Sequence, residues 1–377
     1  NLASQINNLW ETVHDLRFDS SNSYYGNTLS NLEDMSILVG YSPSMFQLPG
    51  IAKGIPSDFK DVTFDLPTLN QGNPVLSGSS LRYSKEVGEN PLSSTHLVVQ
   101  LIGKTESMTR IGWAKIWELL SGNKGNGSLF IRKFYSGYNR PDGRSWLGFL
   151  DGVSNIRPPD RESIISIGER DLNEKDKWTI GGAYMAFIRM KIDLDNWTSR
   201  DIESQERIVG RDKETGCPIV GVRDEKNVAT YGCPFPGTNE IIEYGNERFR
   251  DSFSGRLDIR SYDPNVKLVA YSHAQKMIDA SSQLDSKGEL SRIFRQGYDY
   301  LDPINEFPYF NAGLNFVSYQ NNPQKVLNLL RAGFNQKPND DPYSVLSDFV
   351  SVESAGVFLV PPYSRSQKFP GEMLFTT

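Results

Sequence analysis

Three stretches of this 377-residue chain share one pattern of apolar and polar positions. Each begins with an apolar, β-branched run typical of a strand, continues through a short polar turn, and ends in apolar residues at helical spacing. The three stretches are residues 95–120, 183–209 and 313–330. Their irregular spacing and the long connections between them favour antiparallel sheets with helices on one face over a parallel sheet. The pattern therefore predicts an α+β fold.

Long connections rich in glycine and proline separate these units, at residues 121–128, 138–144 and 210–237. Loops of this length usually carry function or cover something. The chain is long enough for two domains, on a rough prior of about 100–200 residues per domain. Because Gly, Asn, Pro and Asp cluster at 136–144, we predict domains 1–140 and 141–377.

The composition is that of a globular protein, with 38% hydrophobic and 23% charged residues. The net charge of −6 argues against a nucleic-acid surface. No apolar run approaches the roughly 20 residues that cross a bilayer, so we expect a soluble chain without membrane insertion. The chain begins at Asn1, which is compatible with a processed, secreted or periplasmic protein, and the compartment is left open.

Several common kinds of site are disfavoured by the residues that the chain carries. A zinc site built from several Cys and His is disfavoured, because Cys217 and Cys233 have 15 residues between them and no His close by. The nucleophile elbow of Ser-His-Asp hydrolases and the phosphate-binding GxxxxGK[ST] loop do not occur. Histidine chemistry can fall only on His14, His96 and His273.

Of these three histidines, His273 is the best candidate for a functional role. His14 sits among charged residues on a predicted N-terminal helix, and His96 opens a predicted strand as a structural imidazole. His273 follows the apolar run 266–271, which predicts a strand. A side chain at the end of such a strand can project into a cavity, although a structural strand-end histidine is the alternative.

A second candidate is Asp151, which lies in the segment Gly148–Asn155, directly after the apolar and aromatic residues 146–149. Glycine on both sides lets the backbone come close to a flat or bulky ligand. The alternative is an ordinary Asp-Gly turn. A third candidate, Arg295, lies 22 residues beyond His273 in the basic and aromatic segment 292–300, where a solvated face is the alternative.

Together these segments resemble the dye-decolorizing peroxidase family of haem enzymes. That family is recognised by a GxxDG segment, a later haem-ligating His, and an Arg in an RxxRxGY-like run, which match Asp151, His273 and Arg295 in order and approximate spacing. Segments 39–46, 181–184, 205–216 and 356–362 agree with it as well. The resemblance spans roughly residues 36 to 362.

The resemblance implies two ferredoxin-like domains with antiparallel sheets flanked by helices, and one haem b held mainly by the C-terminal half. It implies His273 as the proximal iron ligand, with Asp348 as the acidic partner of its ring and Glu353 as the second choice. The haem-binding residues that it implies are His273, Asp151, Gly152, Val153, Ser154, Arg295 and Asp348. The sequence leaves the oligomeric state open, and a homo-oligomer is one permitted state.

The activity implied is oxidation of dyes, phenols and other organic electron donors by hydrogen peroxide. Asp151 would shuttle the peroxide proton, and Arg295 would stabilise negative charge as the O–O bond breaks. Either residue can dominate in a given member. A carboxylate base implies an acidic optimum near pH about 4.

Bulky dyes would not enter a pocket sized for peroxide, so electrons would reach the haem through aromatic residues. Trp146, Tyr298 and Tyr300 are the first candidates for this relay, with core packing as their alternative role.

The resemblance has one gap. Many bacterial members carry Asn-Pro-Arg after the ligand histidine, where this chain has residues 276–282 reading KMIDASS. Two other functions stay open. One is a haem-binding protein for iron release or haem delivery, and the other is a haem-free α+β binding module in which Asp151 and His273 are structural.

Overall fold

The computed structural model describes most of the chain. Apart from gaps of one to four residues, the described residues are 2–16, 35–62, 81–84, 92–216, 290–334 and 345–375, four short strands between 222 and 243, and His273, Ala274 and Met277. The predicted strand at 266–271 lies outside them. Among the described residues, no helix is both long and apolar enough to span a membrane.

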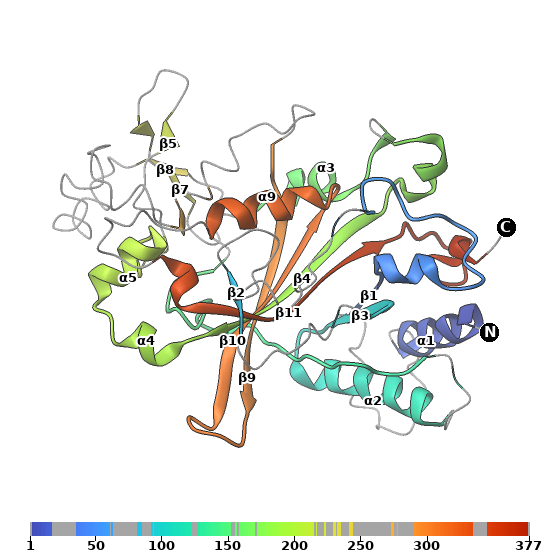
Figure 1. The fold of residues 1–377 in the computed structure, drawn as a ribbon, viewed down its shortest axis with the longest axis horizontal. Coiled ribbons are helices and arrows are strands. Elements are labelled where there is room, and N and C mark those ends of the chain that lie inside the picture. Colours follow the sequence, from blue (N-terminus) through green and yellow to red (C-terminus); the bar gives the residue numbers. More distant parts are fainter. Residues whose placement is uncertain are drawn as a thin grey trace, which may run out of the picture.

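A single seven-stranded sheet organises the described residues (Figure 1). Its strands are, in spatial order, β3 (Leu97–Ile102), β1 (Ser36–Tyr41), β11 (Val350–Val360), β4 (Ala183–Ile192), β10 (Phe310–Gln320) and β9 (Phe294–Pro303), with β2 (Arg82–Tyr83) beside β11. All neighbouring strands are antiparallel except β2 and β11. The predicted antiparallel α+β arrangement is therefore confirmed.

The three predicted strand–helix units are present. Strand β3 leads into α2 (Glu106–Gly122), β4 leads into α4 (Leu194–Thr198) and α5 (Ile202–Val209), and β10 leads into α9 (Gln324–Gly333). The other helices for which the structure describes both ends are α1 (Leu2–Leu16), α3 (Arg161–Ile165) and the 3-10 turns η3 (Pro43–Gln47), η5 (Pro158–Asp160), η7 (Glu174–Thr179), η8 (Leu346–Asp348) and η9 (Glu372–Leu374). Two small hairpins, β5 (Val222–Arg223) with β6 (Ala229–Thr230) and β7 (Gly232–Pro234) with β8 (Ile241–Glu243), complete the description.

The long helices cover one face of the sheet. Helix α9 buries Val326 and Leu330 in the same apolar cluster as Leu359 of β11. Leu359 pairs with Tyr41 of β1, so both side chains lie on this face, and Tyr41 packs with residues of α1. Figure 1 shows α1 and α2 beside β1 and β3, with α9 lying across the sheet near β4 and β10. We call this side the helix face.

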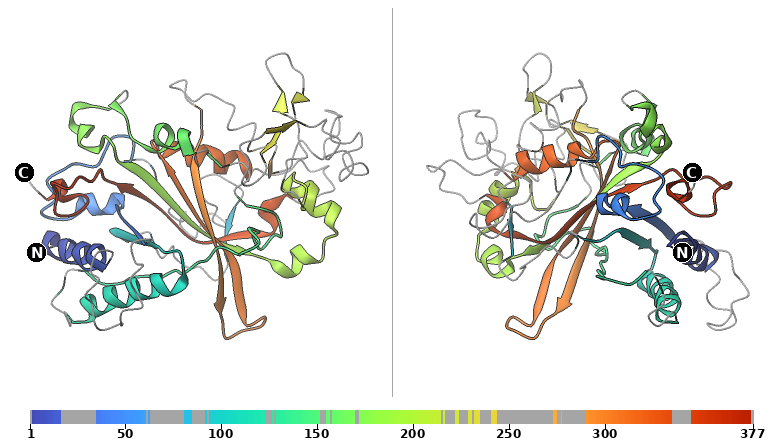
Figure 2. Two further views of the ribbon diagram at one scale, coloured as in Figure 1. Left: turned by 180° about the vertical axis from the view of Figure 1, so that it is seen from behind. Right: turned by 45° about the vertical axis from the view of Figure 1, so that its right-hand side comes forward.

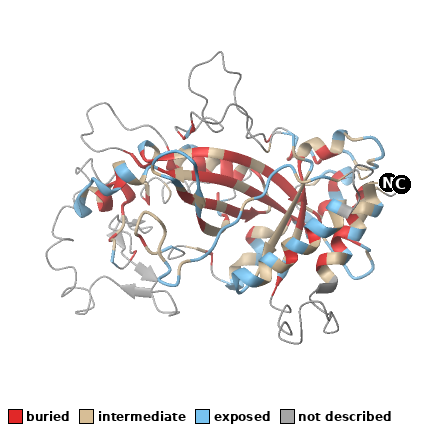
Figure 3. Ribbon diagram, turned by 90° about the horizontal axis from the view of Figure 1, so that it is seen from below, coloured by how far each residue is buried: buried red, intermediate tan, exposed pale blue. Residues whose placement is uncertain are grey.

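The opposite face of the sheet curls onto itself. Val98 of β3 packs in one cluster with Met185 of β4 and Val317 of β10, although three strands, β1, β11 and β4, lie between β3 and β10 in the sheet. The Tyr319 hydroxyl also donates to Gln100, which joins β10 to β3 directly. The twist expected of a sheet this wide permits such contact. Buried residues accordingly run along the strands, whereas the helices expose one side (Figure 3).

A buried arginine holds the curled face together where β11 is bulged, between Val352 and Ser354. The Arg189 side chain is 3% exposed and donates to Glu353 Oε2 at 2.9 Å. It also donates to Asn315 Oδ1 at 2.8 Å and pairs with Asp302. Because every charge in this cluster has a partner, burial of the guanidinium is compensated.

Strands from both sides of residue 140 join this sheet, since β1 pairs with β11. The described strands therefore form one sheet without a gap at residue 140. The division into domains 1–140 and 141–377 stays a prediction. Beyond the sheet body, the β9–β10 hairpin projects outward in both views of Figure 2.

Candidate functional site

Strand β9 ends the sheet, and the loop residues 138–151 and Asn155 lie along its outer edge. At one end of the contact, Tyr138 and Asp299 exchange two backbone hydrogen bonds of 2.9 Å. At the other end, the Asn155 side chain donates to the Arg295 carbonyl at 2.7 Å and accepts from the Arg295 N–H at 3.1 Å. An exposed strand edge offers unpaired backbone groups, and this loop satisfies them.

Asp151 lies between these two anchors. Its backbone N–H donates to the Gly143 carbonyl at 2.9 Å, and the residue is exposed. A Cβ atom added at Gly297 would lie 3.1 Å from Asp151 Oδ2. The carboxylate therefore rests against the backbone of β9, in space that only a glycine leaves open.

Arg295 shares the side of β9 on which Asp151 rests. Residues two apart in a strand point to the same face, so Arg295, Gly297 and Asp299 point the same way. A Cβ at Gly297 would also touch the Leu314 side chain at 3.1 Å, and Phe316, which pairs with Gly297, packs against the core under α9. Asp151 and Arg295 therefore lie on the helix face.

The segment 205–216 supports the loop from behind. Arg144 donates to the Gly148 carbonyl at 2.8 Å, to the Glu214 carbonyl at 2.7 Å and to the Lys213 carbonyl. Gly148 has a φ of 87°, and a Cβ there would lie 2.6 Å from Lys213 Cε. A residue with a side chain would meet both backbone strain and a clash at this position.

His273 contacts the C-terminal end of α9 on the helix face. Its Nδ1 lies 3.0 Å from the Gly333 carbonyl, and its ring centroid lies 4.9 Å from that of Phe334. A carbonyl only accepts, so Nδ1 carries the proton and Nε2 has the lone pair of the neutral ring. A Cβ on Gly333 would lie 3.2 Å from His273 Cε1 and 2.4 Å from Met277 Sδ, so this glycine makes room for the imidazole.

His273 itself is helical, as is Ala274, rather than the last residue of a strand. Its Nδ1 bonds the Gly333 carbonyl, although an acidic partner was expected. Asp348 is exposed at the end of η8, and its role in the site stays a prediction. Glu353 binds Arg189 and the Tyr300 hydroxyl on the curled face.

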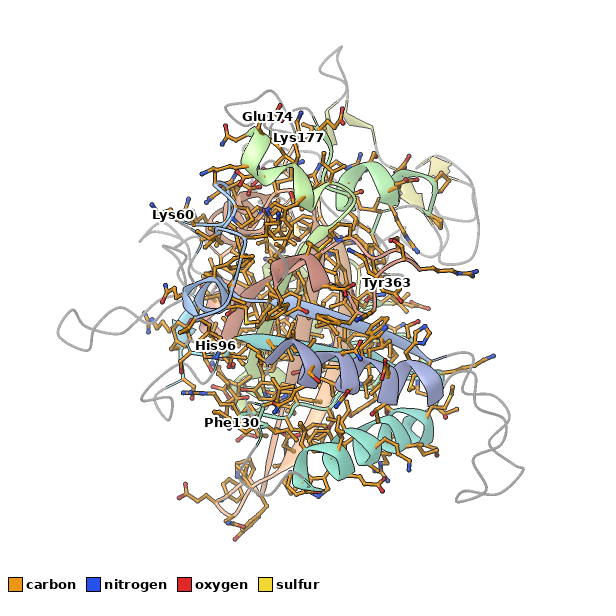
Figure 4. The ribbon with its side chains drawn as sticks, turned by 90° about the vertical axis from the view of Figure 1, so that its right-hand side faces the viewer. Lys60, His96, Phe130, Glu174, Lys177 and Tyr363 are labelled. Atoms are coloured by element: carbon orange, nitrogen blue, oxygen red, sulfur yellow. The ribbon has the colours of Figure 1, made fainter. Side chains whose placement is uncertain are left out.

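The other two histidines lie elsewhere. His96 is exposed and directly precedes β3, as Figure 4 shows, and its carbonyl accepts from the Ser42 N–H at 3.0 Å. His14 stacks on Trp10 within α1, with ring centroids 5.3 Å apart. Within the described ranges, no group of three or more His, Cys, Asp or Glu could hold a metal ion. The predicted contacts of Gly152, Val153 and Ser154 lie outside the described residues.

The candidate relay residues lie around β9. Trp146 donates from its indole N–H to the Tyr300 carbonyl at 3.0 Å. Tyr300 is 1% exposed, and its hydroxyl donates to Glu353 Oε2 at 2.9 Å. Burial raises the pKa of both Tyr300 and Tyr298, so neither phenol ionises at neutral pH.

Asp299 adds a second carboxyl group next to Asp151. Burial raises the pKa of Asp299 to about 6; the charge of Arg140 opposes this rise, and the charge of Asp151 adds to it. Sequence reasoning missed Asp299, Asn155, Gly297 and Gly333. Asp299 stood in the segment 292–300 that was already singled out, and its position two residues from Gly297 was the available signal.

The site thus brings a carboxylate, a guanidinium and an imidazole with a fixed tautomer to one face of one sheet. Such a set can bind one metal centre through a single nitrogen and move a proton beside it. The haem-site roles of Asp151, Arg295 and His273 stay predictions.

Comparison with known proteins agrees with the fold. The family model described as "Dyp-type peroxidase, C-terminal" matches residues 142–365, more than half of the chain. A dye-decolorizing peroxidase from Thermobifida fusca is 24% identical over 83% of this chain and 62% of its own length. A deferrochelatase from Escherichia coli K12 is 24% identical over 57% of this chain and 42% of its own length.

A solved structure of a DyP-type peroxidase from Streptomyces coelicolor has a similar fold. It matches with a TM-score of 0.67 and 21% identity, and the match covers 100% of this chain and 88% of that one. The chain spans less than two thirds of the length of the two curated relatives. From the family model and the shared fold, we conclude that this chain belongs to the DyP-type peroxidase family.

Proposed function

We propose that this protein is a haem peroxidase that uses hydrogen peroxide to oxidise dyes, phenols and other organic reductants. The observation that carries the proposal is the placement of Asp151 and Arg295 on the helix face of β9, the face on which His273 meets the end of α9. Membership of the DyP-type family supports the same activity.

The residues around His273 fit a haem b group. The Gly333 carbonyl fixes the tautomer in which Nε2 is the ligand atom, and a hydrogen bond to the other ring nitrogen makes an imidazole a better ligand. The space beside the ring exists because residue 333 has no side chain. Haem, when bound there, supplies the iron that exchanges electrons with peroxide.

Asp151 and Arg295 act on the peroxide itself in this proposal. The Asp151 carboxylate takes a proton from one oxygen of hydrogen peroxide and returns it to the other oxygen, which departs as water. The Arg295 guanidinium stabilises the negative charge that builds up as the O–O bond breaks. The Asn155 side chain binds the Arg295 backbone, and the Asp151 carboxylate rests against Gly297. These contacts fix the positions of Asp151 and Arg295 relative to each other, so little reorganisation accompanies the reaction.

A spectrum and a rate test this proposal together. The haem-loaded wild type should show a Soret band and oxidise a phenol only when peroxide is added. His273→Ala should lose the wild-type band, whereas Asp151→Asn should keep the band and lose turnover by about 100-fold or more. His96→Ala, which removes an exposed imidazole, is the matched control and should change neither. Turnover retained in Asp151→Asn would overturn the role of that carboxylate.

Haem handling is a second candidate, favoured by the similarity to a protein named deferrochelatase. In that case, the protein should release iron from haem, and Asp151→Asn should leave the release unchanged. Measurement of free iron with a chelating dye, with and without peroxide, separates the two functions. A Soret band that never forms with added haem would favour the haem-free binding module.

A further inference from the structure

Asp299 is a buried carboxyl group that the proposed mechanism does not use. The residue is 5% exposed and points to the same face as Gly297 and Arg295. Its Oδ1 is buried and has no hydrogen-bond partner among the described residues. The Trp146 backbone N–H provides a hydrogen bond to the carboxyl group. A buried carboxyl oxygen without a partner is costly, and such exceptions call for an explanation.

Asp299 interacts electrostatically both with Asp151 and with an ion pair on the protein surface. On one side it interacts electrostatically with Asp151, whose Oδ2 lies against Gly297 two residues away. On the other side it interacts with Arg140 and Asp142, which form an ion pair with contacts of 3.1 and 2.6 Å. Their side chains are 33% and 45% exposed, so this pair faces solvent.

The groups facing Asp299 leave it able to change protonation state. Arg140 is held by both oxygens of Asp142 and does not pair with Asp299 directly. The Tyr138 phenol, also nearby, has a raised pKa and stays neutral. Burial and the neighbouring Asp151 raise the pKa of Asp299 to about 6, within the range in which a carboxyl group gains and loses protons near neutral pH.

Peroxide turnover needs a supply of protons as well as electrons. Two molecules of an organic reductant AH reduce one H2O2 according to H2O2 + 2 AH → 2 H2O + 2 A•. A dye too bulky to reach the peroxide gives up its electrons and protons at a distance from it. If electrons travel through aromatic side chains, the protons need a separate way to the peroxide oxygens.

We propose that Asp299 relays these protons between the surface at Arg140 and Asp142 and the carboxylate of Asp151. This inference rests on the proposed peroxidase function. In this role Asp299 passes protons to Asp151 and does not itself contact peroxide. It is therefore a positioning residue and not a catalytic one. The rival explanation is that Asp299 merely fixes the loop through Trp146.

Comparing the first turnover with steady turnover separates these explanations. In the first reaction with peroxide, Asp151 takes and returns the same proton, so Asp299→Asn should leave this rate within about twofold of wild type. Steady-state kcat needs protons from solvent, so it should fall about tenfold or more and show a larger solvent isotope effect in D2O. Its pH profile should also lose an ionisation near 6. Glu306→Gln, an exposed carboxylate on the same hairpin, is the control and should match wild type. An equal slowing of both rates would overturn the relay and indicate a structural role.

Infrared titration tests the carboxyl pair without any turnover. The carbonyl band of a protonated carboxyl should titrate near pH 6 in the wild type and disappear in Asp299→Asn. In Asp151→Asn its midpoint should fall, because the negative charge of Asp151 contributes to the raised pKa. A midpoint unchanged in Asp151→Asn would overturn the coupling. If the titration midpoint shifts in Asp151→Asn but the wild-type protein never reacts with peroxide, the coupling of the two carboxyl groups stands. The proposed peroxidase function, and with it the relay of protons to peroxide, would then be overturned.

Discussion

The side chain of Asn155 takes the place of a neighbouring strand for Arg295. It donates to the Arg295 carbonyl at 2.7 Å and accepts from the Arg295 N–H at 3.1 Å, across 140 positions of sequence. An amide side chain can do both because it carries a donor and an acceptor, as a peptide group does. This contact fixes the loop that carries Asp151 to the strand that carries Arg295.

Asn155→Ala should therefore weaken the site more than the fold. Loss of three hydrogen bonds, two to Arg295 and one from the Ile156 N–H, should lower the free energy of unfolding by about 3 kcal/mol, measured by urea titration. The rate constant for reaction with peroxide should fall about tenfold or more, because Asp151 and Arg295 lose their common anchor. Asn155→Asp gives a sharper control, since a carboxylate still accepts from the N–H but cannot donate to the carbonyl. Wild-type peroxide kinetics in both variants would contradict this role of Asn155.

Gly297→Ala should displace the Asp151 carboxylate. The new Cβ would lie 3.1 Å from Asp151 Oδ2 and 3.1 Å from Leu314 Cδ1, so both neighbours must move by a few tenths of an ångström. We expect kcat/KM for peroxide to fall about tenfold while the Soret band stays unchanged. Gly168→Ala meets nothing within 4 Å and serves as the control. Equal peroxide kinetics in the two variants would show that the close approach at Gly297 does not matter.

Gly333→Ala should act on haem affinity instead. Its Cβ would lie 3.2 Å from His273 Cε1 and would overlap Met277 Sδ at 2.4 Å, so the imidazole has to shift away from the carbonyl that orients it. Changes in such second contacts of a ligand histidine lower affinity by about 10–100-fold. Transfer of haem to apomyoglobin measures the loss, again with Gly168→Ala for comparison. Unchanged transfer rates would argue against His273 as the ligand held by this contact.

Local patterns in the sequence were enough to predict the elements but not the contacts between them. The alternation and helical spacing predicted the strand–helix units that became β3 with α2 and β10 with α9, because one side of each is buried. The Gly333 carbonyl was not predictable as the partner of His273, since 60 residues separate them and any carbonyl could serve. The family resemblance implied Asp348 as this partner, with Glu353 as the second choice, and Glu353 binds Arg189 on the other face.

Trp146 is the candidate for electron transfer to the haem that the structure makes easiest to test. Its indole N–H bonds the carbonyl of buried Tyr300, so it contacts the strand that carries Arg295. Trp146→Phe keeps an aromatic ring but raises the energy needed to remove an electron. We expect turnover of a bulky dye to fall about tenfold while turnover of a small phenol, which needs no relay if it reaches the haem directly, changes less than twofold. Parallel losses with both substrates would assign Trp146 to packing alone.

Asp299 should make the stability of the protein depend on pH in an unusual direction. Its pKa is raised from 3.8 to about 6 in the folded protein, so between these values the folded state binds more protons than the unfolded state. Its contribution to stability is therefore fully present below pH about 4 and is lost as the pH rises through about 6. Asp299→Asn, which cannot ionise, should be more stable than wild type at pH 7 by about 1–2 kcal/mol, allowing for partial screening by water, and nearly equal to it at pH 4. Urea midpoints of the two proteins at both pH values measure this difference. A variant that is less stable than wild type at pH 7 would mean that the ionised carboxylate is stabilised by its surroundings, which is the opposite of what its burial requires.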